Sequence, residues 1–338
     1  MTFGSVVGHA RVTGLLAQAI SRETLPPTVL FTGPAGVGKW RVAQAVAAVA
    51  NCLEPVRDRA GLAVDACGVC RSCDRIERGV HVDVMAIEPD EKASIKIDVV
   101  RDLIDRIGFR PFEGRRRFVL IREADTLEPS AQNSLLKSLE EPPPATVFIL
   151  TTAVPGVLLS TVRSRCMRLA FARLTEAEVA DLLARDGEMD PREARALAAL
   201  ADGSVGQALA LGNTDMAVLR ETALLVLQEA ARNAGAQGRL QAAAALVTGT
   251  AKKERPRDDI GLVLRLLASM LRDLEVLNAG GDARLLANPA MAEDLDPLRR
   301  AYSGERTREA FAAVDRALFA LERNAGTKVV AEWLAMQL

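Results

Sequence analysis

Five short apolar runs, rich in β-branched and aromatic residues, recur through the first half of the chain. They are TVLFTG (28–33), DVMAIEP (83–89), RFVLIRE (117–123), TVFILTT (146–152) and MRLAFA (167–172). The segments between them include helical patterns such as RVAQAVAAVA. Continuous apolar strands that alternate with helices predict an α/β fold, with a parallel sheet covered on both faces and ligands at the carboxyl ends of the strands.

After Arg173 the strand signals stop and helical periodicity takes over. LTEAEVADLLARDG has apolar residues three and four positions apart, and Thr175 is placed to cap that helix. From about residue 213 the helical patterns become longer, as in DDIGLVLRLLASMLRDLEVL. The pattern therefore predicts three parts: an α/β domain at 1–172, a small helical domain at 173–213 and a larger all-α domain at 214–338.

Composition is that of an ordinary globular protein. Apolar residues make up 49% and charged residues 26% of the 338 residues, and the net charge of -1 argues against a strongly basic protein that coats DNA unaided. There is no apolar run of about 18 residues, and MTFGSVVGHARVT lacks the pattern of a secretory signal. We expect a cytoplasmic protein without a membrane segment, whose five cysteines are metal ligands or buried thiols.

The segment GPAGVGK at 33–39 follows the first predicted strand and precedes a helical pattern. It matches the fixed positions of a phosphate-binding P-loop, in which glycines permit tight turns and the helix N-terminus presents N–H groups to phosphate. The matching residues are Gly33, Gly36, Gly38 and Lys39. We interpret the segment as a P-loop descendant, with a chance glycine turn as the alternative.

The position after Lys39 breaks this pattern. Trp40 stands where a working loop has Ser or Thr as a magnesium ligand. The strand FVLI is followed by Arg122 and Glu123, where the second magnesium anchor should be Asp. Loss of both anchors removes a main electrostatic contribution to hydrolysis, so we expect no Mg²⁺ site and ATP bound passively or not at all.

Four cysteines have the spacing of a metal site. Cys67, Cys70 and Cys73 form CGVCRSC, and Cys52 lies upstream across LEPVRDRAGLAVDA. Four thiolates suffice for a closed tetrahedral zinc site, which leaves no position open for catalytic water. We predict structural zinc in a module at about 52–73, with reactive or buried thiols as the alternative; nearby His81 is interpreted as a solvated or core histidine.

Two further stretches have plain interpretations. The run RRR at 115–117 precedes a buried strand and is read as a solvated turn, with contact to a partner or DNA as the less favoured reading. The stretch EEPPP is read as a helix end, because proline lacks an N–H and disfavours helix before it.

The segment STVRSRCMRL at 160–169 places Ser164, Arg165 and Cys166 between the fourth and fifth strands. Taken with NSLLKSLEEPP (133–143), the P-loop and the four cysteines, it resembles the bacterial clamp-loader subunits of the AAA+ superfamily. The resemblance covers residues 1 to about 212, with the motifs in family order. It implies an AAA+ P-loop domain with a zinc module, a helical lid domain at 173–213 and a helical collar domain at 214–338.

The resemblance also implies that gamma or tau subunits hydrolyse ATP, and that the nucleotide site of each is completed by the SRC arginine of its neighbour. Arg165 has that position here; from its basic surroundings alone it would be read as a solvated residue. ATP-hydrolysing relatives carry a sensor arginine two positions after a GS pair, where ADGSVGQAL has Gly206. Residues used on the chain's own nucleotide are therefore missing, while the residue offered to a neighbour is retained.

These features together predict a non-hydrolysing stator subunit of the DNA polymerase III clamp loader, part of a DNA-directed DNA polymerase complex. The resemblance implies a hetero-pentamer with gamma/tau and delta subunits, which loads the sliding clamp on primed DNA. Two alternatives stay open: a divergent ATP-hydrolysing clamp-loader subunit that recruits Glu123 and another carboxylate for magnesium, and a zinc-bearing AAA+ adaptor outside replication.

Overall fold

The computed structural model describes residues 1–90, 93–108, 110–186, 189–212, 216–232, 236–248, 257–282, 285–288, 291–323 and 325–338. The chain forms two compact units, of which the first comprises Met1–Pro191 with Asp202–Gln207 and the second comprises Arg192–Ala201 with Ala208–Leu338. The expected boundary between residues 213 and 214 lies outside the described residues, and the division into three domains stays a prediction.

The five apolar runs form the central sheet of the first unit. Its strands are β1 (Thr28–Thr32), β4 (Val84–Ile87), β5 (Arg117–Ile121), β6 (Thr146–Thr152) and β7 (Met167–Ala170). All neighbouring pairs are parallel, in the order β4-β5-β6-β1-β7. Every residue of the three central strands β5, β6 and β1 is buried, which explains why these runs are predominantly apolar. The predicted parallel α/β sheet is confirmed.

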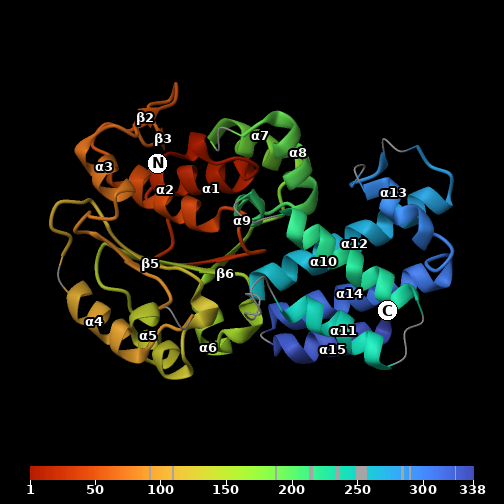
Figure 1. The fold of residues 1–338 in the computed structure, drawn as a ribbon. Helices are drawn as coiled ribbons and strands as arrows, with labels where there is room; N and C mark the ends of the chain where they lie inside the picture. Colours follow the sequence, from red (N-terminus) through yellow and green to blue (C-terminus); the bar gives the residue numbers. More distant parts are fainter. Residues whose placement is uncertain are drawn as a thin grey trace. The chain divides into compact units, whose positions relative to one another are not determined.

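Helices cover both faces of this sheet (Figure 1). They are α1 (Ala10–Ser21), α2 (Lys39–Asn51) and α3 (Arg71–Glu77) on one face, and α4 (Ile97–Ile107), α5 (Pro129–Glu140) and α6 (Ser160–Arg163) on the other. Alternate residues of one strand serve the two cores: Phe118 and Leu120 of β5 join the first cluster, and Val119 and Ile121 join the second.

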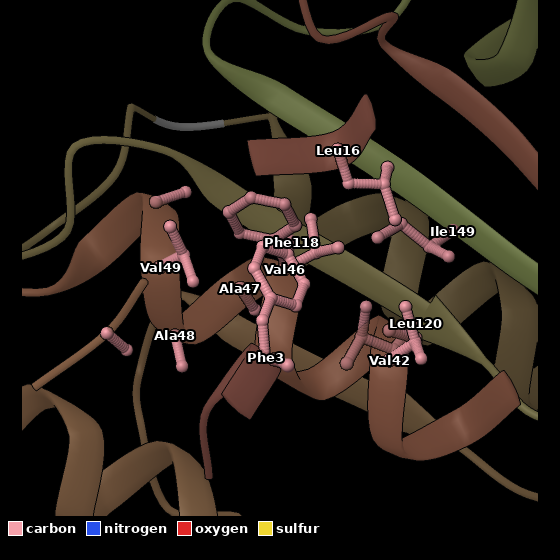
Figure 2. Close-up of a cluster of buried hydrophobic side chains, with 14 of the residues drawn as sticks. Phe3, Leu16, Val42, Val46, Ala47, Ala48, Val49, Phe118, Leu120 and Ile149 are labelled. Atoms are coloured by element: carbon pink, nitrogen blue, oxygen red, sulfur yellow. The ribbon is translucent and has the colours of Figure 1, made fainter. Parts of the chain in front are cut away.

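The first of these cores lies between α2 and the sheet. Figure 2 shows Val42 and Val46 of α2 beside Phe118 and Leu120 of β5, all of which are at most 1% exposed. Burial of apolar side chains contributes roughly 1.5–3 kcal/mol each for residues of this size. This packing fixes α2, and with it the P-loop that leads into the helix, against the sheet.

Short elements complete the first unit. They are η1 (Phe3–Ser5), the antiparallel pair β2 (Val56–Arg57) and β3 (Ala63–Asp65), η2 (Ala124–Thr126), η3 (Pro155–Val157) and α7 (Glu176–Asp186). Before α7, Thr175 Oγ1 accepts the Glu178 N–H at 3.2 Å and Glu178 Oε2 accepts the Thr175 N–H at 2.8 Å. This reciprocal capping box confirms the predicted cap.

The rest of the described chain is mainly helical. Its helices are α8 (Pro191–Leu200), α9 (Val205–Gly212), α10 (Met216–Ala231), α11 (Ala236–Val247), α12 (Arg257–Asn278), α13 (Ala292–Leu295), η7 (Asp296–Leu298), α14 (Glu305–Glu322) and α15 (Thr327–Gln337). Within the second unit, α10 packs on α11 and α12, and α14 packs on α12 and α15. Tyr302 is fully buried there and donates its hydroxyl to the Leu227 carbonyl at 3.1 Å.

The described helices are those of a protein without a membrane-crossing helix in that part of the chain. None of those helices combines the length and the apolar character that crossing a bilayer requires.

Candidate functional site

The P-loop connects β1 to α2, as the sequence predicts, and lies at the carboxyl end of a central strand. Gly33, Gly36 and Gly38 all have positive φ, at 147°, 70° and 101°. Gly38 is the residue before α2, and Lys39 is the first residue of the helix. The loop therefore has the turn, helix and lysine of a phosphate-binding site in the expected order.

Lys39 is directed into its own loop. It is 8% exposed, and its Nζ donates to the carbonyl oxygens of Gly33 at 2.6 Å and Pro34 at 2.5 Å. Burial lowers the pKa of Lys39 to about 8, although the nearby carboxylates of Asp125 and Glu123 act to raise it. A phosphate that recruited this ammonium would have to compete with the two carbonyl bonds.

Gly206, which stands where the family's sensor arginine is expected, lies against the same loop. Its N–H donates to the Gly36 carbonyl at 3.1 Å. A Cβ on Gly206 would lie 3.0 Å from the Gly36 Cα, and a Cβ on Gly36 would lie 2.2 Å from Ser204 Oγ. Only glycine at both positions permits this backbone contact without local displacement.

Arg122 lies at the end of β5, at the position where an acidic magnesium anchor is expected. Its Nη1 lies 3.0 Å from Glu88 Oε2, and its Nε lies 3.5 Å from Glu123 Oε1. The guanidinium carbon lies 6.0 Å from the centre of the Trp40 ring, at the limit of a cation–π contact. The two residues that break the magnesium pattern are thus neighbours in space, and an arginine engages the carboxylate of Glu123.

The threonines that end β6 are engaged by the segment after β5. Thr151 Oγ1 accepts the Glu123 N–H at 3.2 Å, and Thr152 Oγ1 donates to Asp125 Oδ1 at 2.6 Å. Both hydroxyls therefore fix the segment that follows Arg122.

Arg165 lies just beyond α6 and is 31% exposed at its side chain. Its Nε and Nη2 donate to Glu140 Oε2 at 3.3 and 3.0 Å, and its Nη1 donates to the Thr161 carbonyl at 3.0 Å. The Arg165 carbonyl accepts the Thr28 hydroxyl at 2.6 Å, which ties the SRC segment to β1. Cys166 is buried, and burial raises the pKa of its thiol to about 11, so this cysteine is an unreactive packing residue.

Cys52, Cys67, Cys70 and Cys73 come together as predicted, with their sulfur atoms all within 4.8 Å of one another. The sulfur–sulfur distance is 3.5 Å for Cys70 and Cys73, and 3.7 Å for Cys73 and Cys52. Four sulfurs held at about 2.3 Å from one tetrahedral ion would lie roughly 3.8 Å apart. Backbone N–H groups also donate to Cys52 Sγ and Cys67 Sγ, each at 3.3 Å, as suits thiolate ligands. The donor set therefore fits a closed tetrahedral metal site.

The sequence did not predict a buried polar network around Asp83 and Arg117. Arg117, which was read with its neighbours as part of a solvated turn, is 4% exposed and lies 3.1 Å from the fully buried Asp83. Asp83 also accepts backbone N–H groups from Phe112, Glu113 and Gly114 at 2.8–3.0 Å. The expectation for Arg117 was wrong because an acidic partner 34 positions upstream compensates its burial.

His81 is a core histidine, which was one of the two readings offered. It is 4% exposed, and its Nδ1 accepts the Asp83 N–H at 3.1 Å. Burial lowers the pKa of His81, although the carboxylates of Glu113 and Asp83 act to raise it. The histidine therefore belongs to the buried network around Asp83 and not to the cysteine cluster.

The first unit contains the segment that matches a known protein family. Residues 8–175 match the family described as DNA polymerase III, delta subunit. Among solved structures, a gamma subunit-related protein of DNA polymerase III from Thermotoga maritima is similar over 96% of this chain and 98% of that chain. Its sequence identity is 16% and the TM-score is 0.44.

Two kinds of curated relative resemble the chain to a similar degree. The DNA polymerase III subunit delta' of Pseudomonas aeruginosa is 38% identical over 192 residues, which cover 56% of this chain and 57% of that protein. The DNA polymerase III subunit tau of Escherichia coli is 36% identical over 222 residues, which cover 64% of this chain and 33% of that protein. The chain thus spans about a third of the tau relative and somewhat over half of the delta' relative.

Proposed function

Residues 8–175 belong to the family described as DNA polymerase III, delta subunit, and on that premise we propose that the chain is a non-hydrolysing subunit of a clamp loader. In this role it is a delta-prime-type stator that supplies Arg165 to the nucleotide site of a neighbouring ATPase. Sequence identity does not choose between delta' and tau, since the two relatives are 38% and 36% identical. The choice therefore depends on the chemistry of the P-loop.

The observation that carries the proposal is the state of Lys39. In a working P-loop this cation cradles the β- and γ-phosphates, whereas here it bonds to two carbonyls of the loop. Arg122 lies where a carboxylate would hold Mg²⁺, and Gly206 cannot supply a sensor cation. Two contributions to hydrolysis, the carboxylate anchor for Mg²⁺ and the sensor cation, are thus missing from the chain's own site, and Lys39 would have to leave two carbonyls to meet a phosphate.

Arg165 supports the second half of the proposal. An arginine finger stabilises the charge that develops on a transferred phosphoryl group, and its contribution to kcat is about 10³-fold or more. The guanidinium is partly exposed, at 31% of its side chain, so a neighbouring subunit could reach it. We propose gamma/tau and delta subunits as the other members of a hetero-pentamer that loads a sliding clamp on primed DNA, in the cytoplasm.

The cysteine cluster is proposed to hold structural zinc. Four thiolates leave no ligand position for substrate or water, so the ion would supply folding energy and no chemistry. Cys70 precedes α3 and Cys73 lies in its first turn, so a bound ion would join this helix to the end of α2 through Cys52.

Replacement of Cys70 by Ser tests the zinc proposal. We expect the variant to lose bound metal and to melt at a lower temperature, because a thiolate ligand is removed from a closed site. Metal content by mass spectrometry and melting by circular dichroism would be measured on the same samples. Cys166→Ser is the matched control, which should keep its zinc; zinc loss with an unchanged melting curve in Cys70→Ser would contradict a structural role.

The two alternatives predict different behaviour of the purified chain. A divergent ATPase would hydrolyse ATP with Mg²⁺, at a rate destroyed by Lys39→Ala, and our proposal predicts no hydrolysis above the blank in either form. An adaptor outside replication would fail to co-elute with tau and delta subunits in gel filtration, whereas we expect a stable complex. Hydrolysis that depends on Lys39 would overturn the proposed function.

A further inference from the structure

Glu140 is the final residue of α5, and it is the side chain that engages the proposed finger. One carboxylate oxygen, Oε2, accepts both the Nε and Nη2 donors of Arg165, at 3.3 and 3.0 Å. Pro142 and Pro143 follow the end of α5 in the sequence. Because proline disfavours helix before it, the EEPPP stretch also fixes where the helix ends and places Glu140 beside the finger.

The contact is framed by two packed helices. α5 packs against α6, and Leu139 of α5 and Val162 of α6 are 3% and 0% exposed in one apolar cluster. Arg165 is also held by the Thr161 carbonyl, which accepts from Nη1 at 3.0 Å. The guanidinium therefore has a defined orientation before any neighbour is present.

Arg165 keeps N–H donors that could bind a phosphate group. A guanidinium has five N–H donors in a planar fork, and three of them have partners among the described residues. The carboxylate occupies the side edge formed by Nε and Nη2, which leaves one N–H on each terminal nitrogen. The remaining N–H groups, one on each terminal nitrogen, can each donate to an oxygen of the same phosphate.

We propose that Glu140 is a positioning residue for the arginine finger, which holds the side edge of Arg165 so that its terminal edge is presented to a nucleoside triphosphate in the neighbouring subunit. The inference rests on the proposed function. Glu140 touches no reacting group and acts only through Arg165. A misplacement of a catalytic group by about 1 Å can cost roughly 10²-fold in rate. Orientation of Arg165 by Glu140 can therefore raise the rate of ATP hydrolysis even if the contact adds little to the folding stability of the chain.

The contact contributes little to folding. Glu140 and Arg165 are 60% and 31% exposed at their side chains, and exposed ion pairs typically contribute about 0–1 kcal/mol. Removal of the carboxylate should therefore leave the chain folded and change the rate alone, which makes the proposal testable by substitution.

The test uses a complex reconstituted from the full chain and its ATPase neighbours, with DNA-stimulated ATP turnover as the readout. Glu140→Gln should lower kcat by roughly three- to tenfold, less than Arg165→Ala, with an unchanged KM for ATP. Glu141→Gln is the matched control, because it removes the same charge one position along the chain from an exposed side chain. Among the described residues the Arg165 guanidinium donates to Glu140 and Thr161 and not to Glu141, so this variant should keep the parental rate.

A double variant separates positioning from a general structural effect. With Arg165→Ala already present, Glu140→Gln should cause no further loss of rate, because its effect passes through the arginine. A Glu140→Gln rate that is unchanged or raised while Arg165→Ala is slow would overturn the role of Glu140 and spare the finger. A further loss in the double variant would also overturn it, and an unchanged rate for Arg165→Ala would overturn both.

Discussion

Asp83 is a fully buried carboxylate that is satisfied by Arg117 and by three backbone N–H groups. Asp83→Ala should lower the free energy of unfolding by about 3–5 kcal/mol, because Arg117 would be left as an uncompensated buried charge. Asp74→Ala is the control, since its pair with Arg78 is exposed and should contribute about 0–1 kcal/mol. Urea denaturation of both variants measures the difference, and equal midpoints would contradict the assigned role of the network.

The same carboxylate predicts a pH dependence. Burial alone would raise the pKa of Asp83, but the three N–H donors and Arg117 outweigh burial and hold the pKa below its ordinary value. A depressed folded pKa contributes stability that is present above the unfolded pKa of about 4 and lost as pH falls through the folded value. The stability difference between the parent chain and Asp83→Asn should therefore be full at neutral pH and shrink in acid.

At the scale of residues, the sequence predicts which residues are candidates for the site better than it predicts which residues they contact. The spacing of GPAGVGK identified Lys39 and Gly36, and the SRC motif identified Arg165. The partners of Lys39 and Arg165 were not predicted, because hydrogen-bond geometry depends on how distant segments meet. Glu140 was read only as part of a helix end, and no local signal in EEPPP distinguishes a carboxylate that holds an arginine.

Between elements, the contact of Gly206 with the P-loop makes a testable prediction. Gly206 lies in α9, where Ala is intrinsically favoured over Gly by about 1 kcal/mol. Its added Cβ would meet the Gly36 Cα at 3.0 Å, so Gly206→Ala should fail to gain this stability or should lose it. Gly14→Ala in α1 is the control, because a Cβ there meets nothing within 4 Å.

Thermal melting of the two variants is the measurement, with amide hydrogen exchange at 33–39 as a local readout. We expect Gly14→Ala to melt at or above the parental temperature and Gly206→Ala to melt below Gly14→Ala with faster exchange in the loop. Equal stabilisation by both substitutions would show that the backbone contact does not hold the loop.

Strands were the elements most readily predicted. The central runs in β1, β5 and β6 are mostly apolar because both faces of the sheet are covered, and this nearly continuous apolar character is a strong signal in the sequence. The short pair β2 and β3 in the cysteine segment was not predicted, since two- and three-residue strands with partly exposed side chains carry no periodicity. What the sequence predicts in that segment is the grouping of the four cysteines, whose sulfur atoms lie within 4.8 Å of one another.

For the whole molecule, similarity to relatives indicates the family, whereas the residues at the P-loop bear on whether the chain hydrolyses ATP. Relatives named delta' and tau match the chain to nearly the same degree, so family membership alone does not decide whether it hydrolyses ATP. Lys39 donates to carbonyls of its own loop and Arg165 is partly exposed, and together these favour a subunit that acts on a neighbour's nucleotide. We propose that this chain contributes to ATP hydrolysis through Arg165 and not through its P-loop.

One comparison tests that claim most directly: the DNA-stimulated ATPase rate of the reconstituted complex with either Arg165→Ala or Lys39→Ala in this chain. With Arg165→Ala we expect a fall of about 10³-fold at the neighbouring ATPase site that Arg165 is proposed to complete, and with Lys39→Ala an unchanged rate. The opposite pattern, in which Lys39→Ala slows turnover and Arg165→Ala does not, would contradict it.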